Sequence, residues 1–186
     1  MHVFLIAAIS LDGFIAERTD QVSTDWTSKA DKKFFSERTK QAKLMVMGGT
    51  TFTTIGRLLP GRVTIIYTRD GKKYAEQYGL PVQDVQEAWP EDPTKTLFTT
   101  QLEPKELVKF LAEQSHTELA VCGGGSVYNQ FLKAGVVETL YLTLEPILFG
   151  DGVKLLNEPQ VQHLQLQKST QLDPNTVVLE YKLTSG

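Results

Sequence analysis

Cysteine, long apolar runs and clustered basic residues are all scarce in this chain of 186 residues. The single cysteine, Cys122, excludes an internal disulfide and a cysteine-rich zinc site. No apolar run is long enough to span a bilayer. No run of lysine and arginine exceeds two residues, and the formal net charge is −3. The sequence therefore predicts a protein with neither a membrane nor a nucleic-acid partner, and no metal site.

A signal peptide is also not expected. The apolar residues 3–9 have no basic segment before them and lead into Ser10-Leu-Asp-Gly13, which is not a small-residue cleavage site. Hydrophobic residues make up 41% of the chain and charged residues 22%, which is ordinary for a soluble globular protein. We therefore expect one cytoplasmic domain that comprises residues 1–186.

Short apolar segments alternate with helical patterns along most of the chain. Strands are expected over residues 2–9, 14–16, 44–47, 63–67, 82–85, 118–122 and 137–144. Helices are expected over residues 29–42, 50–55 and 70–79, after Pro104, and between the glycine run and Gly135. Residues 86–100 show no clear pattern, and residues 163–170 and 176–183 suit a hairpin. The predicted fold is α/β, with a mostly parallel sheet flanked by helices and an antiparallel C-terminal hairpin.

Three consecutive glycines, Gly123 to Gly125, join an apolar strand to the next helical pattern. Strand, glycine turn and helix is an arrangement that lets backbone N–H groups approach a phosphate at a helix N-terminus. Glycine also tolerates the positive φ that such a turn often requires. Glycine runs equally form bare turns or close packing points, so the motif by itself leaves both interpretations open.

Several motifs, in their order along the chain, resemble the dihydrofolate reductase superfamily, which includes the reductase domain of riboflavin biosynthesis. They are Ile6-Ala-Ala-Ile-Ser-Leu-Asp-Gly-Phe-Ile15, Ala30-Asp31 with Phe35, Val46-Met-Gly48, Thr51-Phe-Thr-Thr-Ile-Gly-Arg-Leu-Leu-Pro-Gly-Arg62, Gly123-Gly-Gly-Ser-Val-Tyr128 and Leu140-Tyr-Leu-Thr143. The resemblance extends to about Leu156 and is weakest over residues 70–100. It implies the fold of that superfamily, an oxidoreductase activity and NADPH as the cofactor.

The resemblance implies that two helix starts contact the cofactor's phosphates: the glycine turn, and Gly48-Gly-Thr-Thr51. Typical dihydrofolate reductases carry a basic residue where Gly49 stands, so Arg69 is the expected substitute cation for the 2′-phosphate. The alternative for Arg69 is a solvated surface arginine. The implied cofactor-binding residues are Ala8, Ile15, Gly48, Gly49, Thr50, Thr51, Thr68, Arg69, Cys122, Gly123, Gly124, Gly125, Ser126, Val127 and Tyr128, with Tyr128 on the nicotinamide side.

Asp31 is the expected catalytic carboxyl group. A carboxylate accepts paired hydrogen bonds from a pterin ring N–H and its exocyclic amine, and its charge favours protonation of the adjacent ring nitrogen. On the buried face of a helix its pKa should be raised by desolvation. The alternative is a first-turn acid that interacts with the helix dipole. Trp26, five residues earlier, and Phe35, four later, match the family pattern.

Thr143 is expected to hydrogen-bond Asp31 and hold its orientation, so the implied catalytic set is Asp31, Trp26 and Thr143. The implied substrate-binding residues are Ala8, Ile15, Phe35, Ile55, Leu59 and Arg62. Dihydrofolate reductases place an arginine at the position of Arg62 to bind the carboxylate of the glutamate tail, a bidentate task. The alternative for Arg62 is a turn arginine after Pro-Gly.

The substrate is the least determined part of the prediction. Ser10-Leu-Asp-Gly13 and Pro146-Ile-Leu-Phe-Gly-Asp-Gly152 resemble the riboflavin-pathway reductase, which reduces a ribose carbon of a phosphoribosylamino-pyrimidine with NADPH. Asp31, Arg62 and Thr143 fit folate better, so NADPH-dependent reduction of dihydrofolate to tetrahydrofolate is the expected activity. The alternative is 5-amino-6-(5-phosphoribosylamino)uracil reductase, and the third hypothesis is an NADPH-binding regulatory domain without turnover. A monomer or a homodimer is expected.

Overall fold

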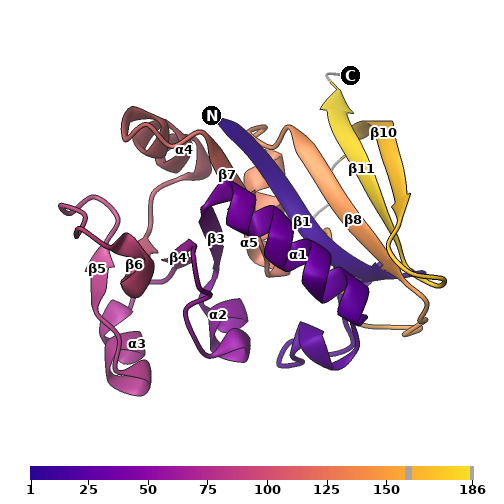
Figure 1. Cartoon of the computed structure of the whole chain (residues 1–186), viewed down its shortest axis with the longest axis horizontal. Helices are drawn as coiled ribbons and strands as arrows, with labels where there is room; N and C mark the ends of the chain where they lie inside the picture. Colours follow the sequence, from indigo (N-terminus) through magenta and orange to yellow (C-terminus); the bar gives the residue numbers. More distant parts are fainter. Residues whose placement is uncertain (158–160, 185–186) are drawn as a thin grey trace.

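The computed structural model of this protein describes residues 1–157 and 161–184 (Figure 1). A nine-stranded sheet forms its centre, in the spatial order β10-β11-β8-β1-β7-β3-β4-β6-β5. The strands are β1 (His2–Ser10), β3 (Leu44–Gly48), β4 (Val63–Tyr67), β5 (Val82–Asp84), β6 (Leu97–Thr100), β7 (Glu118–Val121), β8 (Thr139–Glu145), β10 (His163–Gln171) and β11 (Val177–Thr184).

Helices connect most of these strands. They are α1 (Lys29–Ala42), α2 (Gly49–Ile55), α3 (Gly71–Tyr78), α4 (Pro104–Glu113) and α5 (Gly125–Lys133), with single 3₁₀ turns η1 (Ser23–Asp25) and η2 (Pro93–Lys95). A separate antiparallel pair is formed by β2 (Phe14–Ala16) and β9 (Val153–Lys154). In Figure 1, α1 crosses the front of the sheet, where it contacts β3 and β7.

The direction of the strands determines where a site can form. Every neighbouring pair from β8 across to β5 is parallel, whereas β11 runs antiparallel to β8 and to β10. The carboxyl ends of the parallel strands therefore lie along one edge of the sheet, which we call the carboxyl edge, and ligands of open α/β sheets bind at such an edge. The predicted fold class, mostly parallel with an antiparallel C-terminal hairpin, is confirmed.

Two apolar layers hold the helices against the sheet. Side chains of successive residues in a strand point to opposite faces. Val3 and Leu5 of β1 belong to the layer that includes residues of α4 and α5. Phe4 and Ile6 belong to the layer that includes Phe52 of α2 and residues of α1 and α3. Because β1 is buried on both faces, its sequence is a nearly continuous apolar run.

Two strands were not predicted from the sequence. β6 lies inside the segment without a clear pattern, residues 86–100, and its Leu97 and Phe98 are completely buried between β4 and β5. β9 has two residues and is defined by its pairing with β2. Both elements are too short for a period to appear, so their positions depend on their partners.

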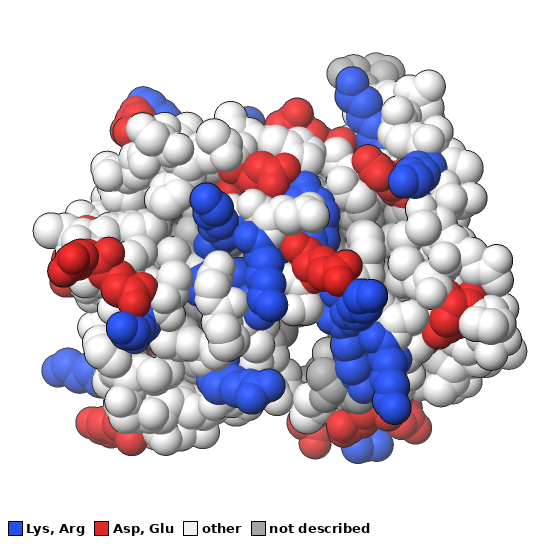
Figure 2. Space-filling view, viewed as in Figure 1, with Lys and Arg blue, Asp and Glu red and all other residues white. Residues whose placement is uncertain are grey.

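The charged side chains are mixed over the face that Figure 2 shows, where acidic groups lie between the basic ones around α1. Within residues 1–157 and 161–184, no helix has the combined length and apolar character that a membrane crossing requires. Over the same residues, no group of three or more histidine, cysteine or acidic side chains is arranged to hold a metal ion.

Candidate active site

Asp31 lies in the first turn of α1, at the carboxyl edge, and is 8% exposed. Burial raises the pKa of its carboxyl group from 3.8 to about 6. The negative charge of Glu145 raises this pKa further, while the hydroxyls of Thr143 and Thr27 and the charge of Lys32 lower it. The predicted rise of the Asp31 pKa through desolvation is thus confirmed, and the group is partly protonated near neutral pH.

The other two residues of the predicted catalytic set, Trp26 and Thr143, each have a buried polar atom without a partner in the described part of the chain. The indole Nε1 of Trp26 and the Oγ1 of Thr143 are buried, and neither has a hydrogen-bond partner among the described residues. Thr143 lies close enough to the Asp31 carboxyl group to lower its pKa, but its Oγ1 makes no hydrogen bond to a described residue within ordinary distance and angle limits. Buried donors without partners cost free energy. They therefore indicate a place where water or a polar substrate atom would bind.

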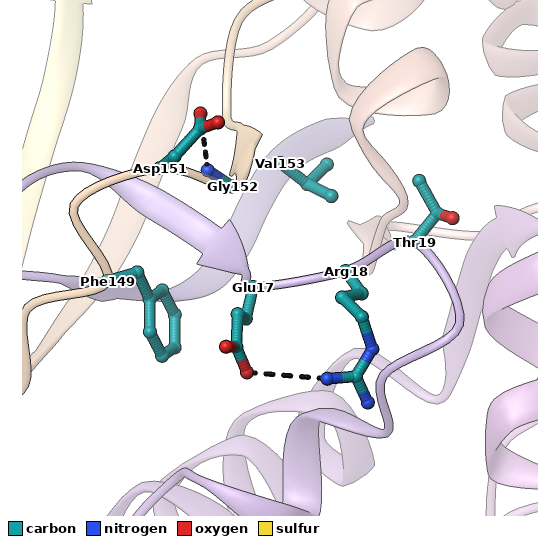
Figure 3. A pocket seen from close by; sticks show the side chains of 7 residues that line it. All are labelled: Glu17, Arg18, Thr19, Phe149, Asp151, Gly152 and Val153. Atoms are coloured by element: carbon teal, nitrogen blue, oxygen red, sulfur yellow. Dashed lines mark hydrogen bonds and ion pairs between the residues drawn. The ribbon is translucent and has the colours of Figure 1, made fainter.

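Trp26 is held from its other side by Phe149. The two rings meet edge to face, with centroids 5.1 Å apart. Phe149 lines a cavity of about 520 Å³ between the segment after β2 and the turn before β9 (Figure 3). The cavity is lined by Glu17, Arg18, Thr19, Phe149, Asp151, Gly152 and Val153. Trp26, the neighbour in sequence of Thr27, therefore packs against a ring that lines an open cavity, and this cavity was not predicted from the sequence.

Arg62 immediately precedes β4 and is only 3% exposed. Its Nη1 donates to Thr39 Oγ1 over 2.8 Å, and its Nε donates to the Pro60 carbonyl over 3.3 Å. Burial lowers the pKa of the guanidinium, although an arginine remains charged at any ordinary pH. Eight residues of α1 separate Asp31 from Thr39, a rise of about 12 Å along the helix. The carboxyl group and the guanidinium thus lie toward opposite ends of α1.

The glycine turn and the second helix start meet at the carboxyl edge. Gly48 N–H donates to the Gly123 carbonyl over 2.7 Å. A Cβ on Gly124 would lie 3.1 Å from Thr51 Oγ1, tighter than ordinary contact, and Gly123 has a φ of +107°. Side chains at these positions would fill the space between α2 and α5. The glycines thus act as close packing points, one of the two interpretations, and phosphate binding by this turn stays a prediction.

The starts of α2 and α5 differ from those of the other helices. Among the α-helices in the described part of the chain, α1 and α3 are capped by Ser28 and Asp70, and α4 has a capping box. The N-caps of α2 and α5, Gly48 and Gly124, provide no side-chain hydrogen bond. The first N–H groups of a helix have no carbonyl partner within it. Two uncapped helix starts at one edge therefore fit a phosphate-containing cofactor.

The other predicted cofactor residues are placed in different ways. Tyr128 is buried, and its hydroxyl donates to the carbonyl of Ile6 in β1 over 2.8 Å. The hydroxyl proton therefore already has an acceptor within the protein. Burial raises the pKa of the Cys122 thiol far above its ordinary value, which keeps the thiol protonated. The hydroxyl of Tyr74, from α3, occupies the space that a side chain at Gly49 would need. Arg69 is exposed after the end of β4.

The apolar residues predicted for the substrate are all at least partly accessible. Ala8, Ile15, Phe35 and Ile55 are of intermediate exposure, in β1, β2, α1 and α2. Leu59 lines a second cavity, of about 430 Å³, between the turn before β4 and the segment around Thr94. Thr50 and Ser126 are exposed at their helix starts, while Thr51 and Thr68 are half-buried.

Three residues near Asp31 and Arg62 were missing from the predicted site: Thr27, Thr39 and Glu145. Thr39 lies eight residues after Asp31 on the buried side of α1, a spacing that a helical pattern carries. Glu145 is a carboxylate at the end of β8, a strand with leucine at every second position, and it is 2% exposed. A charged residue that continues a buried strand was the available signal.

Comparisons with known proteins agree on the family. The sequence model of the RibD C-terminal domain matches residues 1–178. The riboflavin biosynthesis protein RibD of Bacillus amyloliquefaciens is 33% identical over 88 residues, which are 43% of this chain and 24% of that protein, so the match spans about a quarter of RibD. The dihydrofolate reductase of Buchnera aphidicola is 27% identical over 152 residues, which are 81% of this chain and 76% of that enzyme.

Solved structures with low sequence identity share the fold. A putative riboflavin biosynthesis protein from a Shewanella species has a TM-score of 0.70 at 21% identity and full coverage of both chains. A deaminase/5-amino-6-(5-phosphoribosylamino)uracil reductase from Thermotoga maritima has a TM-score of 0.72 at 17% identity, covering 98% of this chain and 56% of its own. Dihydrofolate reductase from Enterococcus faecalis, complexed with NADP(H), has a TM-score of 0.67 at 21% identity, covering 99% and 97%.

These findings confirm the predicted superfamily, and with it the prediction of an oxidoreductase, since the family and its neighbours are reductases. The match covers nearly the whole chain, from the first strand into β11. The chain belongs to the RibD C-terminal domain family.

Proposed function

We propose that this protein is an NADPH-dependent reductase whose substrate contains a pyrimidine ring bound against Asp31. The observation that carries the proposal is the buried Asp31 carboxyl group, with its pKa raised to about 6, at the same edge of the sheet as two uncapped helix starts. When bound, NADPH supplies the hydride. Asp31 supplies what the cofactor does not: a group that holds a proton near neutral pH in a water-poor site.

The backbone of Gly124 to Val127 and of Gly49 to Thr51 would hold the pyrophosphate of the cofactor. Their fit rests on the missing side-chain caps and on the glycines between α2 and α5. Cation support for the 2′-phosphate would come from Arg69, because Tyr74 closes the space where a basic side chain at position 49 would stand. The preference for NADPH over NADH thus depends on an exposed residue.

The ring of the substrate would lie between Ile15 and Phe35, with its N–H edge on Asp31. The unpartnered Trp26 Nε1 and Thr143 Oγ1 would bind water or substrate atoms beside it. An anionic end about 12 Å away along α1 would approach Arg62, which Thr39 holds in place. An elongated substrate with a ring at one end and an anion at the other suits this arrangement.

The substrate that we propose is 5-amino-6-(5-phosphoribosylamino)uracil. The family match and the named relatives favour the riboflavin-pathway reaction, the reverse of the order expected from the sequence. In that reaction the ribose carbon gains a hydride, its bond to the ring oxygen breaks, and that oxygen takes a proton. Asp31 is suited to hold the proton, and Arg62 to attract the substrate's phosphate.

Dihydrofolate is the second candidate, favoured by similarity to the Buchnera enzyme. Its glutamate carboxylate would take the place of the phosphate. Here the hydride goes to a pterin carbon and the proton to the adjacent ring nitrogen, so the same carboxyl group serves both reactions. The difference between the candidates lies in what the site does with the ribose or the glutamate tail.

The test measures oxidation of NADPH by absorbance with each substrate in turn. Turnover with the phosphoribosylamino-uracil, lost in Asp31→Asn and retained in the exposed control Asp25→Asn, supports the proposal. Turnover with dihydrofolate alone would replace it by the second candidate. Binding of NADPH without oxidation in the presence of either compound would indicate a regulatory domain.

A further inference from the structure

We propose that Glu145 is a positioning residue for Asp31: its buried carboxylate holds Ser28, which in turn fixes the first turn of α1. The inference rests on the proposed function only in treating Asp31 as the acid of the site. Glu145 ends β8, and Ser28 immediately precedes α1, so 117 residues separate the two partners. Glu145 makes no contact with substrate in this proposal.

Ser28 makes three hydrogen bonds: its N–H and its O–H each donate one, and its Oγ accepts one. Ser28 N–H donates to Glu145 Oε1 over 3.0 Å, and Ser28 Oγ donates to the same oxygen over 2.9 Å. Ser28 Oγ also accepts from the N–H of Asp31 over 3.0 Å. A serine hydroxyl has one proton and can accept at its lone pairs. Because the hydroxyl proton of Ser28 points to Glu145, the lone pairs of the Ser28 oxygen face the start of α1. Ser28 therefore caps the helix in one orientation.

Burial makes this arrangement specific. Glu145 is 2% exposed and pairs in register with Ser10 of β1 at the end of the sheet. A carboxylate removed from water needs hydrogen bonds to offset its desolvation, and the two from Ser28 are charge-assisted. An N-cap serine on a surface helix needs no such partner. The sheet therefore sets the position of the α1 start, and with it the position of Asp31.

The charge of Glu145 has a second effect, separate from its hydrogen bonds. Two parts of the chain besides α1 act on the Asp31 carboxyl group: Glu145 and Thr143 belong to β8, and Thr27 belongs to the segment before α1. The hydroxyl of Tyr128, from α5, faces Asp31 as a neutral group, because burial first and the charge of Asp31 after it raise its pKa. On α1 itself Lys32 acts in the opposite direction to Glu145. Glu145 is the anion of this group, and its charge favours the protonated form of Asp31.

Two substitutions separate position from charge. In Glu145→Gln the amide oxygen still accepts from Ser28, but the negative charge is lost. We expect the Asp31 carboxyl group, followed by carbon-detected NMR titration of the full chain, to titrate roughly one pH unit lower. The amide of Asp31 should keep its hydrogen-exchange protection. Glu138→Gln, an exposed residue just before β8, is the matched control and should leave the titration unchanged.

Ser28→Ala has the opposite expected result. It removes the hydroxyl that caps α1 while leaving the charge of Glu145. Hydrogen exchange of the Asp31 amide should therefore accelerate roughly fivefold, whereas the pH at which the Asp31 carboxyl group titrates should stay as high as in the unmodified protein. Ser28→Thr should restore the protection. In the reductase assay, the activity limb that reports Asp31 should move to lower pH in Glu145→Gln.

Neither NMR measurement requires cofactor or substrate, so a failed reductase assay leaves the inference testable. An Asp31 titration that is unchanged in Glu145→Gln would show that Glu145 does not act on the acid. Equal Asp31 protection in Ser28→Ala and the unmodified protein would show that the cap does not fix it. If Glu145→Gln fails to fold, the Ser28 pair of variants still decides whether the cap that Glu145 holds fixes Asp31, and equal protection in that pair overturns the inference.

Discussion

Arg62, just before β4, forms a hydrogen bond with Thr39 on the buried side of α1, the helix that carries Asp31. Nη1 of Arg62 donates to Thr39 Oγ1 over 2.8 Å, and the Thr39 hydroxyl donates its own proton to the Phe35 carbonyl over 2.6 Å. Thr39 is completely buried. The hydroxyl can therefore only accept from the guanidinium, and it fixes one edge of Arg62 while the described bonds leave Nη2 for a ligand.

The first prediction concerns Thr39→Val, which keeps the shape and removes the hydroxyl. A buried guanidinium N–H then has no acceptor, so we expect the free energy of unfolding to fall by about 1–3 kcal/mol. The KM for an anionic substrate should rise about tenfold with kcat nearly unchanged, since substrate binding is weakened more than hydride transfer. Urea unfolding and steady-state kinetics measure the two effects.

Thr53→Val is the control for this substitution, because Thr53 is exposed on α2 and its hydroxyl bonds only to the Gly49 carbonyl. It should change neither quantity appreciably. A Thr39→Val protein with an unchanged KM would show that Arg62 does not bind the anion of the substrate.

The second prediction is that Asp31 makes the protein less stable as pH rises. Its folded-state pKa, about 6, lies above the unfolded value of 3.8. Below pH 3.8 the carboxyl group is protonated in both the folded and the unfolded state, so it does not lower the free energy of unfolding there. Between the two values the unfolded chain ionises first, so stability falls as pH rises through about 6 and then levels off. The total loss is about 3 kcal/mol, at about 1.36 kcal/mol per pKa unit.

Asp31→Asn removes this dependence. Relative to the unmodified protein, we expect it to become more stable by up to about 3 kcal/mol between pH 4 and pH 7 while losing reductase activity. Urea unfolding at a series of pH values provides the comparison, with the exposed Asp25→Asn as control. Parallel stability curves for Asp31→Asn and the unmodified protein would exclude a raised pKa.

Local patterns predicted the fold and part of the site. Apolar runs located β1, β3, β4 and β7, and Ser28 and Asp31 were recognisable as the first turn of a helix, since caps and periods belong to neighbouring residues. β6 was missed because four residues, two of them threonines, show no period until β4 and β5 enclose them. Its burial is a property of the sheet.

The missed site residues have distant partners. Glu145 ends a strand and would be assigned to the surface by its type, but it is buried because Ser28 lies against it, 117 residues away in the chain. Thr39 meets its arginine 23 residues later. Trp26 was in the predicted site, yet its contact with Phe149 and the adjoining cavity depend on how two loops meet. No local pattern encodes such pairs.

The third prediction tests the source of cofactor preference. Arg69→Ala should reduce the ratio of kcat/KM for NADPH over NADH by about fivefold, because it removes a charge-assisted contact with the 2′-phosphate. Since Arg69 is exposed, the effect should shrink as ionic strength rises. Arg57→Ala, an exposed arginine after α2, is the control. A ratio that is unchanged in Arg69→Ala would remove this residue from the site.

The last prediction concerns the turn that carries Phe149. The Asp12 carboxylate accepts from Ser10 Oγ over 2.6 Å and from Gly150 N–H over 2.7 Å, and these bonds, that of Ser10 first, lower its pKa below 3.8. Asp12 therefore stabilises the fold above pH 3.8, and this contribution is lost as pH falls through the lower folded value. The Gly150 amide proton should titrate with that midpoint by NMR, and Asp12→Asn should abolish the titration.

Gly152 provides the internal control, because its N–H bonds to Asp151 Oδ1 over 2.8 Å, a bond that Asp12→Asn leaves in place (Figure 3). A Gly150 titration that persists in Asp12→Asn would assign the effect to another acid. Because Phe149 N–H also donates to Asp12 and the Phe149 ring packs against Trp26, the variant should loosen Trp26 as well. The fluorescence of Trp26 should then become more accessible to a neutral quencher, because the Asp12 carboxylate holds the turn on which Phe149 packs against the indole.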